Sequence, residues 1–222
     1  LILAAVPSVA AGLLPAALAT FCKNHPQVDV RITELRSLFI PAAVADGICD
    51  VGVSVPPADG RVSFKQLFND ELVAVCRVDD PIAKMKSVPW KAFRSRPWIA
   101  FTHGNSIRAA AESIFQNLKI DITPKYECQY FSTIGRLIEN GLGISVLSEL
   151  MFKQIKTDCI VARPLVQPNA SRSVGVVTRI GRTPPPAAKE ILEALVTSVS
   201  HFRHGSTPVS AGQILPADRP HS

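Results

Sequence analysis

Two successive stretches of the chain repeat one alternation of strand-like and helix-like segments, and this repetition limits the fold more than any single motif. The first stretch has helical apolar spacing between strand-like runs at 1–6, 28–33 and 50–55. The second has the same order between strand-like runs at 98–101, 126–129 and 144–147. Strands that alternate with helices are typical of parallel sheets with right-handed crossovers. The sequence therefore predicts an α/β fold built from two similar units.

Two further strand-like runs stand where the units join. Leu72–Cys76 lies between the units, and Val174–Thr178 follows the second unit, before three prolines and a last helical stripe. A chain of 222 residues exceeds the usual size of one compact domain. Because each run would carry the chain from one unit to the other, we expect lobe I to hold residues 1–73 and 178–202, lobe II residues 74–177, and a disordered tail residues 203–222.

The charge and the cysteines exclude several classes of partner. The net charge is +6 and the pI is about 9.2, but the basic residues are scattered and no basic run interleaved with aromatic residues occurs. We therefore expect no nucleic-acid surface in these residues. The five cysteines form no CxxC motif and are odd in number, which indicates neither a zinc site nor a disulfide framework. A reducing cytoplasm is the expected compartment.

The uncharged stretch 1–22 has the composition of a signal peptide or a membrane span. No basic segment precedes it, and Pro7 and Pro15 divide it into an extended piece and a helical piece. We interpret it as a buried strand followed by a core helix, and we expect no membrane association.

Motifs of enzymes are missing from the sequence. No GxSxG, HExxH, GxxxxGK[ST] or strand-adjacent GxGxxG pattern occurs, and the histidines have no spacing that suggests a nucleophile pair or a metal site. The run Asn140-Gly141-Leu142-Gly143 follows a helix instead of opening one, so Gly141 is interpreted as a left-handed residue that ends this helix. We expect no catalytic residue, no metal and no cofactor.

Serines mark the predicted carboxyl ends of strands in both units. These positions are Ser8, Ser37, Ser106 and Ser132, each close to a predicted helix start. Ligands of open α/β sheets bind at such ends, where helix N-termini offer unpaired N–H groups and partial positive charge. A carboxylate would fit a cleft that such ends share. The alternative is that each serine only caps its own helix; Ser8 and Ser37 favour a ligand role because they occupy matching places.

Other side chains near the same predicted cleft are more ambiguous. Arg108 could add a cation or serve a structural role, and His103 could bind in the pocket or lie on the surface. Apolar walls could come from Phe101, Tyr130 and Phe131, although each could equally belong to the core.

Several short runs stand in a characteristic order along the chain. The first half carries Val6-Pro7-Ser8-Val9, His25-Pro26-Gln27-Val28 and Ala45-Asp46-Gly47-Ile48-Cys49-Asp50. The second half carries Asp80-Pro81-Ile82-Ala83, Gly104-Asn105-Ser106-Ile107-Arg108 and Gly141-Leu142-Gly143-Ile144. With these runs in this order, residues 1 to 202 resemble the effector-binding domain of LysR-type transcriptional regulators.

The resemblance implies two Rossmann-like lobes with a hinge, similar to type 2 periplasmic binding proteins, and an effector in the cleft between the lobes. It also implies that DNA is bound only by an N-terminal winged helix-turn-helix domain that this sequence does not include, so we expect a true start upstream of Leu1. Family members pair these domains, which implies a homodimer or homotetramer.

The resemblance also implies a set of effector-binding residues. From lobe I these are Val6, Pro7 and Ser8 after the first strand and Ser37 after the second. From lobe II they are the loop that follows Phe101, namely Thr102, His103, Gly104, Asn105 and Ser106, and the strand end at Gln129 and Tyr130, with Phe131 beside it. Pro41 departs from the pattern and weakens the assignment of Ser37.

The function that we expect is the binding of a small organic anion, a carboxylate, by an effector domain that couples the anion to DNA binding. Two rivals remain open. A periplasmic solute-binding protein would need an export signal and would usually avoid several free cysteines. An enzyme on a two-lobed α/β scaffold would need a perturbed acid or base in the cleft.

Overall fold

Helices and strands alternate along the chain, and the computed structural model describes residues 1–204, with side-chain burial for residues 1–200. The strands are β1 (Ile2–Ala5), β2 (Arg31–Glu34), β3 (Val51–Ser54), β4 (Val62–Arg77), β5 (Val88–Pro89), β6 (Trp98–Phe101), β7 (Pro124–Cys128), β8 (Ser145–Ser148), β9 (Ile160–Val166) and β10 (Ser171–Arg179). The α-helices are α1 (Pro7–Gly12), α2 (Leu14–Asn24), α3 (Ile40–Ala45), α4 (Ser106–Asn117), α5 (Phe131–Glu139), α6 (Glu149–Ile155) and α7 (Pro186–His204). Two 3-10 helices are η1 (Pro81–Lys84) and η2 (Trp90–Ser95).

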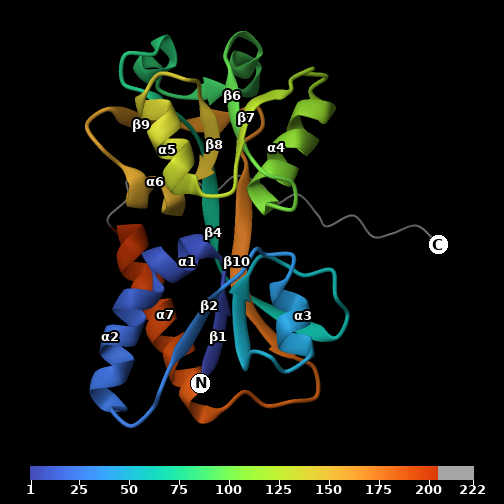
Figure 1. Cartoon of the computed structure of the whole chain (residues 1–222), viewed down its shortest axis with the longest axis vertical. Coiled ribbons are helices and arrows are strands. Elements are labelled where there is room, and N and C mark those ends of the chain that lie inside the picture. Colours follow the sequence, from blue (N-terminus) through green and yellow to red (C-terminus); the bar gives the residue numbers. More distant parts are fainter. Residues whose placement is uncertain (205–222) are drawn as a thin grey trace, which may run out of the picture.

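The first unit is the parallel βαβαβ arrangement that the sequence predicts. β1 lies between β2 and β3 and pairs with both in parallel. The second strand is shorter than predicted, because only Arg31–Glu34 enters the ladder and Ile32 is partly exposed at this edge of the sheet. Helices α1, α2 and α7 lie together beside the sheet, and α3 packs on β3 and β10 (Figure 1).

Two long antiparallel strands join the lobes. β4 and β10 pair from Val62 opposite Arg179 to Glu71 opposite Ser171, and Figure 1 shows both strands passing from one lobe into the other. The sequence predicts only residues 72–76 of β4 and 174–178 of β10 as strand, because the rest of β4 mixes polar and charged residues with apolar ones. Pairing across the whole length makes the connection a two-stranded ribbon.

The second unit differs from the first more than the sequence predicts. β6 and β7 form a separate parallel pair, joined to the start of β8 only by a bridge between Trp98 and Ile144. β8 and β9 both pair antiparallel with β4, and β5 extends the sheet beyond β9. The strands β5 and β9 were not predicted, because β5 has only two residues and Arg163 and Pro164 interrupt the apolar run of β9.

The buried hydrophobic residues fall into two clusters, one in each lobe. The first holds the apolar residues of β1, β3, α1 to α3 and α7, and the second those of the C-terminal half of β4, β6, α4, α5 and β8. An aromatic group anchors the second cluster, in which the Phe115 ring meets the rings of Trp90 and Trp98 edge-on, at centroid distances of 5.4 and 5.2 Å. The residue boundaries expected for the lobes stay a prediction.

The C-terminal ends of α5 and α7 test two predictions made from the sequence. Gly141 follows the C-cap Asn140 of α5 with a φ of 74°, so its prediction as a left-handed residue is confirmed. The last helix contains Ile191, Leu195 and Val199 on its buried face, as predicted, and continues to His204. The expected tail 203–222 therefore begins too early by two residues, and the remainder lies outside the described residues.

Gly175 occupies a position in the ribbon that tolerates no side chain. It lies at a β-bulge, opposite Ser54 on one side and Gln66 on the other, and a Cβ there would approach the Lys65 carbonyl oxygen to 2.4 Å. The obstacle is backbone, which cannot move aside as the tip of a side chain can.

We therefore expect Gly175→Ala to lower the free energy of unfolding by about 1–3 kcal/mol, as overpacking of a closed site does. Denaturant titration measures the change. Gly60→Ala is the matched control, because nothing lies within 4 Å of a Cβ at Gly60, and a similar loss in both variants would contradict the prediction.

Candidate functional site

The carboxyl ends of the first three strands form one level edge in lobe I. Ala5 of β1 stands opposite Glu34 of β2 and Val53 of β3. The next residues stay in register, because the Val6 N–H donates to the Val53 carbonyl and the Leu35 N–H donates to the Ala5 carbonyl, at 3.1 and 3.0 Å. The predicted residues Val6, Pro7 and Ser8 and the loop with Ser37 therefore start side by side, as expected for parallel strands.

Ser8 is fully buried and faces the two-stranded ribbon of β4 and β10. Its Oγ accepts a hydrogen bond of 2.8 Å from Nη2 of Arg172 on β10. No local pattern indicates this partner, which is 164 residues away along the chain.

A buried ion pair crosses the two hinge strands directly. Arg172 of β10 stands opposite Asp70 of β4, and its Nε and Nη2 donate to the Asp70 Oδ2 at 3.0 and 2.7 Å. Both side chains are almost entirely removed from solvent. A buried charge is tolerated when its remaining hydrogen-bonding capacity is satisfied, and here the partners come from both lobes.

These partners tie helix α1 of lobe I to helix α6 of lobe II. Arg172 also donates to Oγ of Ser148, the N-cap residue of α6, and the Leu150 N–H donates to the Asp70 Oδ1 at 3.1 Å. The side-chain amide of Gln154 on α6 donates to the Ser8 carbonyl at 2.9 Å. The ion pair and its neighbours therefore form one continuous brace, here called the hinge brace, on the α1 and α6 side of the molecule.

The loop after β6 holds the predicted lobe II residues in a rigid frame. Phe101 is buried, Thr102, Asn105 and Ser106 are half-buried, and His103 and Gly104 are exposed. The Asn105 side chain caps α4 by accepting from the Ile107 N–H at 2.8 Å. The Thr102 N–H donates to the Cys128 carbonyl at 3.0 Å, which sets this loop beside the end of β7.

Arg108 is structural. Its guanidinium donates to the Phe101 carbonyl, to Glu127 and to Glu112, at 2.8, 2.7 and 2.8 Å. The hydrogen bond from Arg108 holds the pKa of the Glu127 carboxyl below its usual range. The Arg108 Nη2 also lies 3.0 Å from Nε2 of His103. Because a guanidinium only donates, the His103 ring nitrogen can take part in a hydrogen bond here only as the acceptor.

The end of β7 is the most open part of the predicted site. Gln129 and Tyr130 are exposed, Phe131 is half-buried, and the only side-chain contact of the Gln129 amide among the described residues is the Tyr130 hydroxyl, at 3.4 Å. Tyr130 is the N-cap residue of α5 and makes no side-chain capping bond.

The alternative in which the four serines cap their helices is wrong. The N-cap residues of α1, α3, α4 and α5 are Val6, Phe39, Asn105 and Tyr130. Ser8 and Ser132 lie at the second helical position, Ser106 at the first, and Ser37 in the turn before α3.

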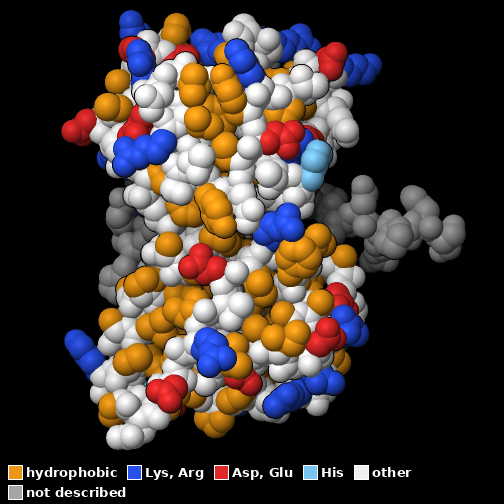
Figure 2. Space-filling view, in the orientation of Figure 1, with side chains coloured by type: hydrophobic (Ala, Val, Ile, Leu, Met, Phe, Trp, Pro, Cys, Tyr) orange, Lys and Arg blue, Asp and Glu red, His pale blue; other side chains and the backbone are white. Residues whose placement is uncertain are grey.

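A residue that the sequence analysis overlooked connects the two lobes on the other side. Arg36, in the loop after β2, donates from Nη1 to the His103 carbonyl at 3.3 Å. Its guanidinium also lies over the Phe39 ring, 4.8 Å from the centroid. In the surface view, basic and hydrophobic side chains meet at mid-height, where the lobes join (Figure 2). A cation directly before Ser37 was the available sequence signal.

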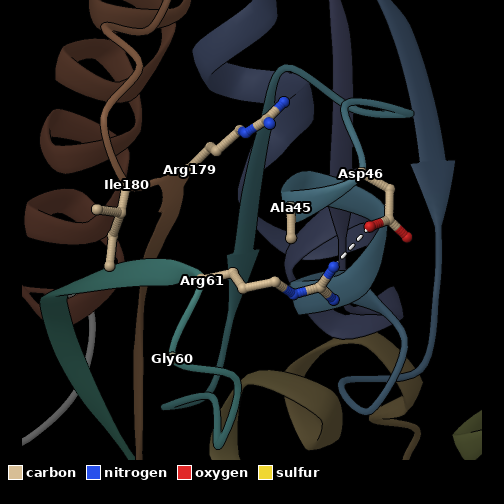
Figure 3. A pocket seen from close by; sticks show the side chains of 6 residues that line it. All are labelled: Ala45, Asp46, Gly60, Arg61, Arg179 and Ile180. Carbon is tan, nitrogen blue, oxygen red and sulfur yellow. Dashed lines mark hydrogen bonds and ion pairs between the residues drawn. The ribbon is translucent and has the colours of Figure 1, made fainter.

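A separate open cavity of about 560 Å³ lies on lobe I, at the C-terminal end of α3. Asp46, Arg61 and Arg179 line it, and the Arg61 side chain reaches across to Asp46 (Figure 3). α3 ends here and begins near the loop with Arg36, so this cavity lies at the far end of the helix from the predicted cleft residues.

The cysteines differ strongly in access. Cys22 and Cys159 are exposed, Cys128 is half-buried, and Cys49 and Cys76 are buried. Burial, with help from the nearby Asp80 carboxylate, raises the pKa of the Cys76 thiol to about 11. Within residues 1–200 no group of metal-ligating side chains comes together, and no helix there has the length and apolar character of a membrane span.

Comparison with known proteins identifies the family. Residues 1–200 match the model of the LysR substrate binding domain. The chain belongs to this family. The fold class and the regulator resemblance expected from the sequence are thereby confirmed.

Named relatives and solved structures are similar to this chain over most of its length. The HTH-type transcriptional regulator YbhD of Escherichia coli K12 is 28% identical over 195 residues, which cover 87% of this chain and 62% of YbhD. The chain thus spans less than two thirds of that relative. The regulatory domain of Synechocystis CcmR, solved with 2-PG, has a TM-score of 0.81 at 21% identity and covers 89% of this chain and 95% of that one. The effector-binding domain of BenM, solved with its effector benzoate, has a TM-score of 0.80 at 18% identity, with coverage of 94% and 95%.

We expect Asp70→Asn to lower the free energy of unfolding by about 3–5 kcal/mol, because the amide keeps the shape but leaves the Arg172 charge buried without its counterion. Denaturant titration measures the loss. Asp79→Asn breaks the exposed pair with Arg77 and should matter far less. Equal effects of the two substitutions would mean that the hinge brace adds no more than a surface pair.

We expect iodoacetamide at about pH 8 to modify Cys22 and Cys159 of the native protein well before Cys76, since only the thiolate reacts and the Cys76 thiol stays protonated and covered. Mass spectrometry of peptides after timed quenching gives the order. Denatured protein, in which all thiols should react at similar rates, is the control. Early labelling of native Cys76 would contradict the buried placement of β4.

Proposed function

We propose that the chain is the effector-binding domain of a LysR-type regulator, that it binds a small organic carboxylate between its lobes, and that this binding is coupled to DNA binding by a domain outside this sequence. The observation that carries the proposal is the contact between the loop after β2 and the loop after β6. It places the carboxyl-end loops of both α/β units against each other, where Arg36 donates to the His103 carbonyl.

The proposed site keeps the residues expected from the sequence. Lobe I would contribute Val6, Pro7, Ser8 and Ser37, and lobe II would contribute Phe101, Thr102, His103, Gly104, Asn105, Ser106, Gln129, Tyr130 and Phe131. Their hydroxyl and amide groups include donors, and the α5 N-terminus has no side-chain cap, which favours an anion.

Ser8 has two roles in this proposal. Its oxygen accepts from Arg172, while its O–H finds no acceptor among the described residues, so the proton stays available for a carboxylate. Because Ser8 is fully buried, a ligand reaches it only when the lobes separate on the side of the Arg36 contact.

The biological setting is proposed from the relatives. YbhD is named as a transcriptional regulator, which supports a regulator and not an enzyme, located in the cytoplasm and acting as a homodimer or homotetramer. CcmR was solved with 2-PG and BenM with benzoate. Both ligands support a small effector for this chain as well.

We expect benzoate or 2-PG to raise the thermal unfolding midpoint of the domain in proportion to occupancy, because a ligand that binds only the folded state stabilises it. Benzamide, which keeps the ring but lacks the charge, should give no rise. Titration calorimetry on the same samples measures affinity. If benzamide stabilises the domain as well as benzoate does, an anion-binding cleft is ruled out.

A further inference from the structure

Arg36 makes one long hydrogen bond and one contact with an aromatic ring among the described residues. Its contacts among the described residues are the His103 carbonyl at 3.3 Å and the face of Phe39. A guanidinium carries five N–H donors, so most of its hydrogen-bonding capacity is free. No carboxylate of the described residues pairs with it, whereas Arg108 pairs with Glu112 and Glu127, and Arg172 pairs with Asp70.

Ser54 presents the opposite case, a buried polar group with no partner at all. The residue ends β3 and has no exposed surface, and its Oγ finds no hydrogen-bond partner among the described residues. Ser145, the first residue of β8 in lobe II, is also a buried serine, and its Oγ donates to the Ile99 carbonyl at 2.7 Å. An unsatisfied buried hydroxyl costs stability, so Ser54 is not explained by folding alone.

Both residues belong to the same edge of the sheet. Ser54 follows Val53 in β3 as Val6 follows Ala5 in β1 and Leu35 follows Glu34 in β2. Neighbouring strands lie about 4.8 Å apart, which puts Ser54 and Leu35 roughly 10 Å from each other across β1. Arg36 is the next residue after Leu35.

Ser54 also points to the face of the sheet that α3 covers. A Cβ at Gly52 would lie 2.5 Å from Cγ2 of Ile40, so Gly52 points to α3. Ser54 is two residues further along the strand and therefore points to the same face. The loop with Arg36 runs directly into Ile40, the first residue of α3. Arg36 thus belongs to the segment that leads into the helix on the Ser54 face.

We propose that Arg36 binds the carboxylate of the effector at the mouth of the cleft and that the Ser54 hydroxyl binds a second polar group of the same molecule at its base. This inference rests on the proposed function, and it narrows the effector to a small hydroxy-acid or a chemically similar acid. The bound carboxylate replaces the His103 carbonyl as the partner of Arg36, which exchanges a neutral acceptor for a charged one.

The test compares two substitutions with two matched controls, using benzoate and para-hydroxybenzoate as probes. Arg36→Gln should weaken the binding of both acids roughly ten- to a hundredfold. Ser54→Ala should weaken para-hydroxybenzoate about two- to tenfold and leave benzoate unchanged, because only the former carries the hydroxyl. Arg94→Gln is the control for Arg36. Arg94 also donates to a carbonyl, that of Lys119, but it belongs to lobe II, whereas Arg36 belongs to lobe I.

A second measurement needs no ligand. Ser145→Ala removes a made hydrogen bond and should lower the thermal unfolding midpoint, whereas Ser54→Ala removes an unsatisfied hydroxyl and should leave it unchanged or raise it. If both variants lose the same stability, Ser54 has a structural partner and its assignment to a ligand is wrong.

The outcomes separate this inference from the proposed function. If wild-type protein binds the acids and both Arg36→Gln and Ser54→Ala bind them equally well, the inference is overturned and the carboxylate-binding function stands. If neither acid binds the wild-type domain, both are overturned. Loss of binding in Arg94→Gln to the same extent as in Arg36→Gln also overturns the inference, because the effect would then be one of net charge.

Discussion

The buried ion pair between Asp70 and Arg172 decides how the two lobes meet. Removing two charges from water costs several kcal/mol for each ion, and a pair repays this cost only with good geometry and satisfied neighbours. Both conditions hold here. The guanidinium makes two bonds to one carboxylate oxygen and reaches Ser8 and Ser148, while the other oxygen accepts from the Leu150 N–H. Any separation of α1 from α6 would leave part of this set unsatisfied.

The two sides of the lobe junction are therefore unequal. On the α1 and α6 side, the hinge brace consists of buried, mostly charge-assisted hydrogen bonds, supported by the bond from Gln154 to the Ser8 carbonyl. On the other side, the bond from Arg36 to the His103 carbonyl is long and exposed. The Arg36 side therefore has the weaker hydrogen bonding of the two sides, and the bulge at Gly175 lies in the ribbon that joins the lobes.

A ligand shifts an equilibrium between two states only through contacts that differ between them. Arg36 donates to the His103 carbonyl across the lobe junction, and in the inference above a bound carboxylate takes the place of this carbonyl. Charges elsewhere in lobe II serve a different purpose. The cluster of Arg108 with Glu112 and Glu127 fixes the loop after β6 and presents the His103 carbonyl in one place. The loop after β6 is thus held in place by charged contacts within lobe II.

The sequence by itself determined the parallel βαβαβ unit, the last helix and the left-handed Gly141, because periodicity, capping and turn residues are local properties. It also predicted a site at the strand ends, since parallel strands bring these ends to one edge. Only the tertiary structure decided what the side chains there bind. Ser8 was expected to bind a ligand or cap its helix, and its oxygen accepts a hydrogen bond from Arg172. Ser54 was not among the predicted site residues, and its buried hydroxyl has no hydrogen-bond partner among the described residues. Partners 102 and 164 residues apart meet through the long β4 and β10 ribbon, and no local pattern encodes such a meeting, because it depends on strand register and on the packing of α1 against α6.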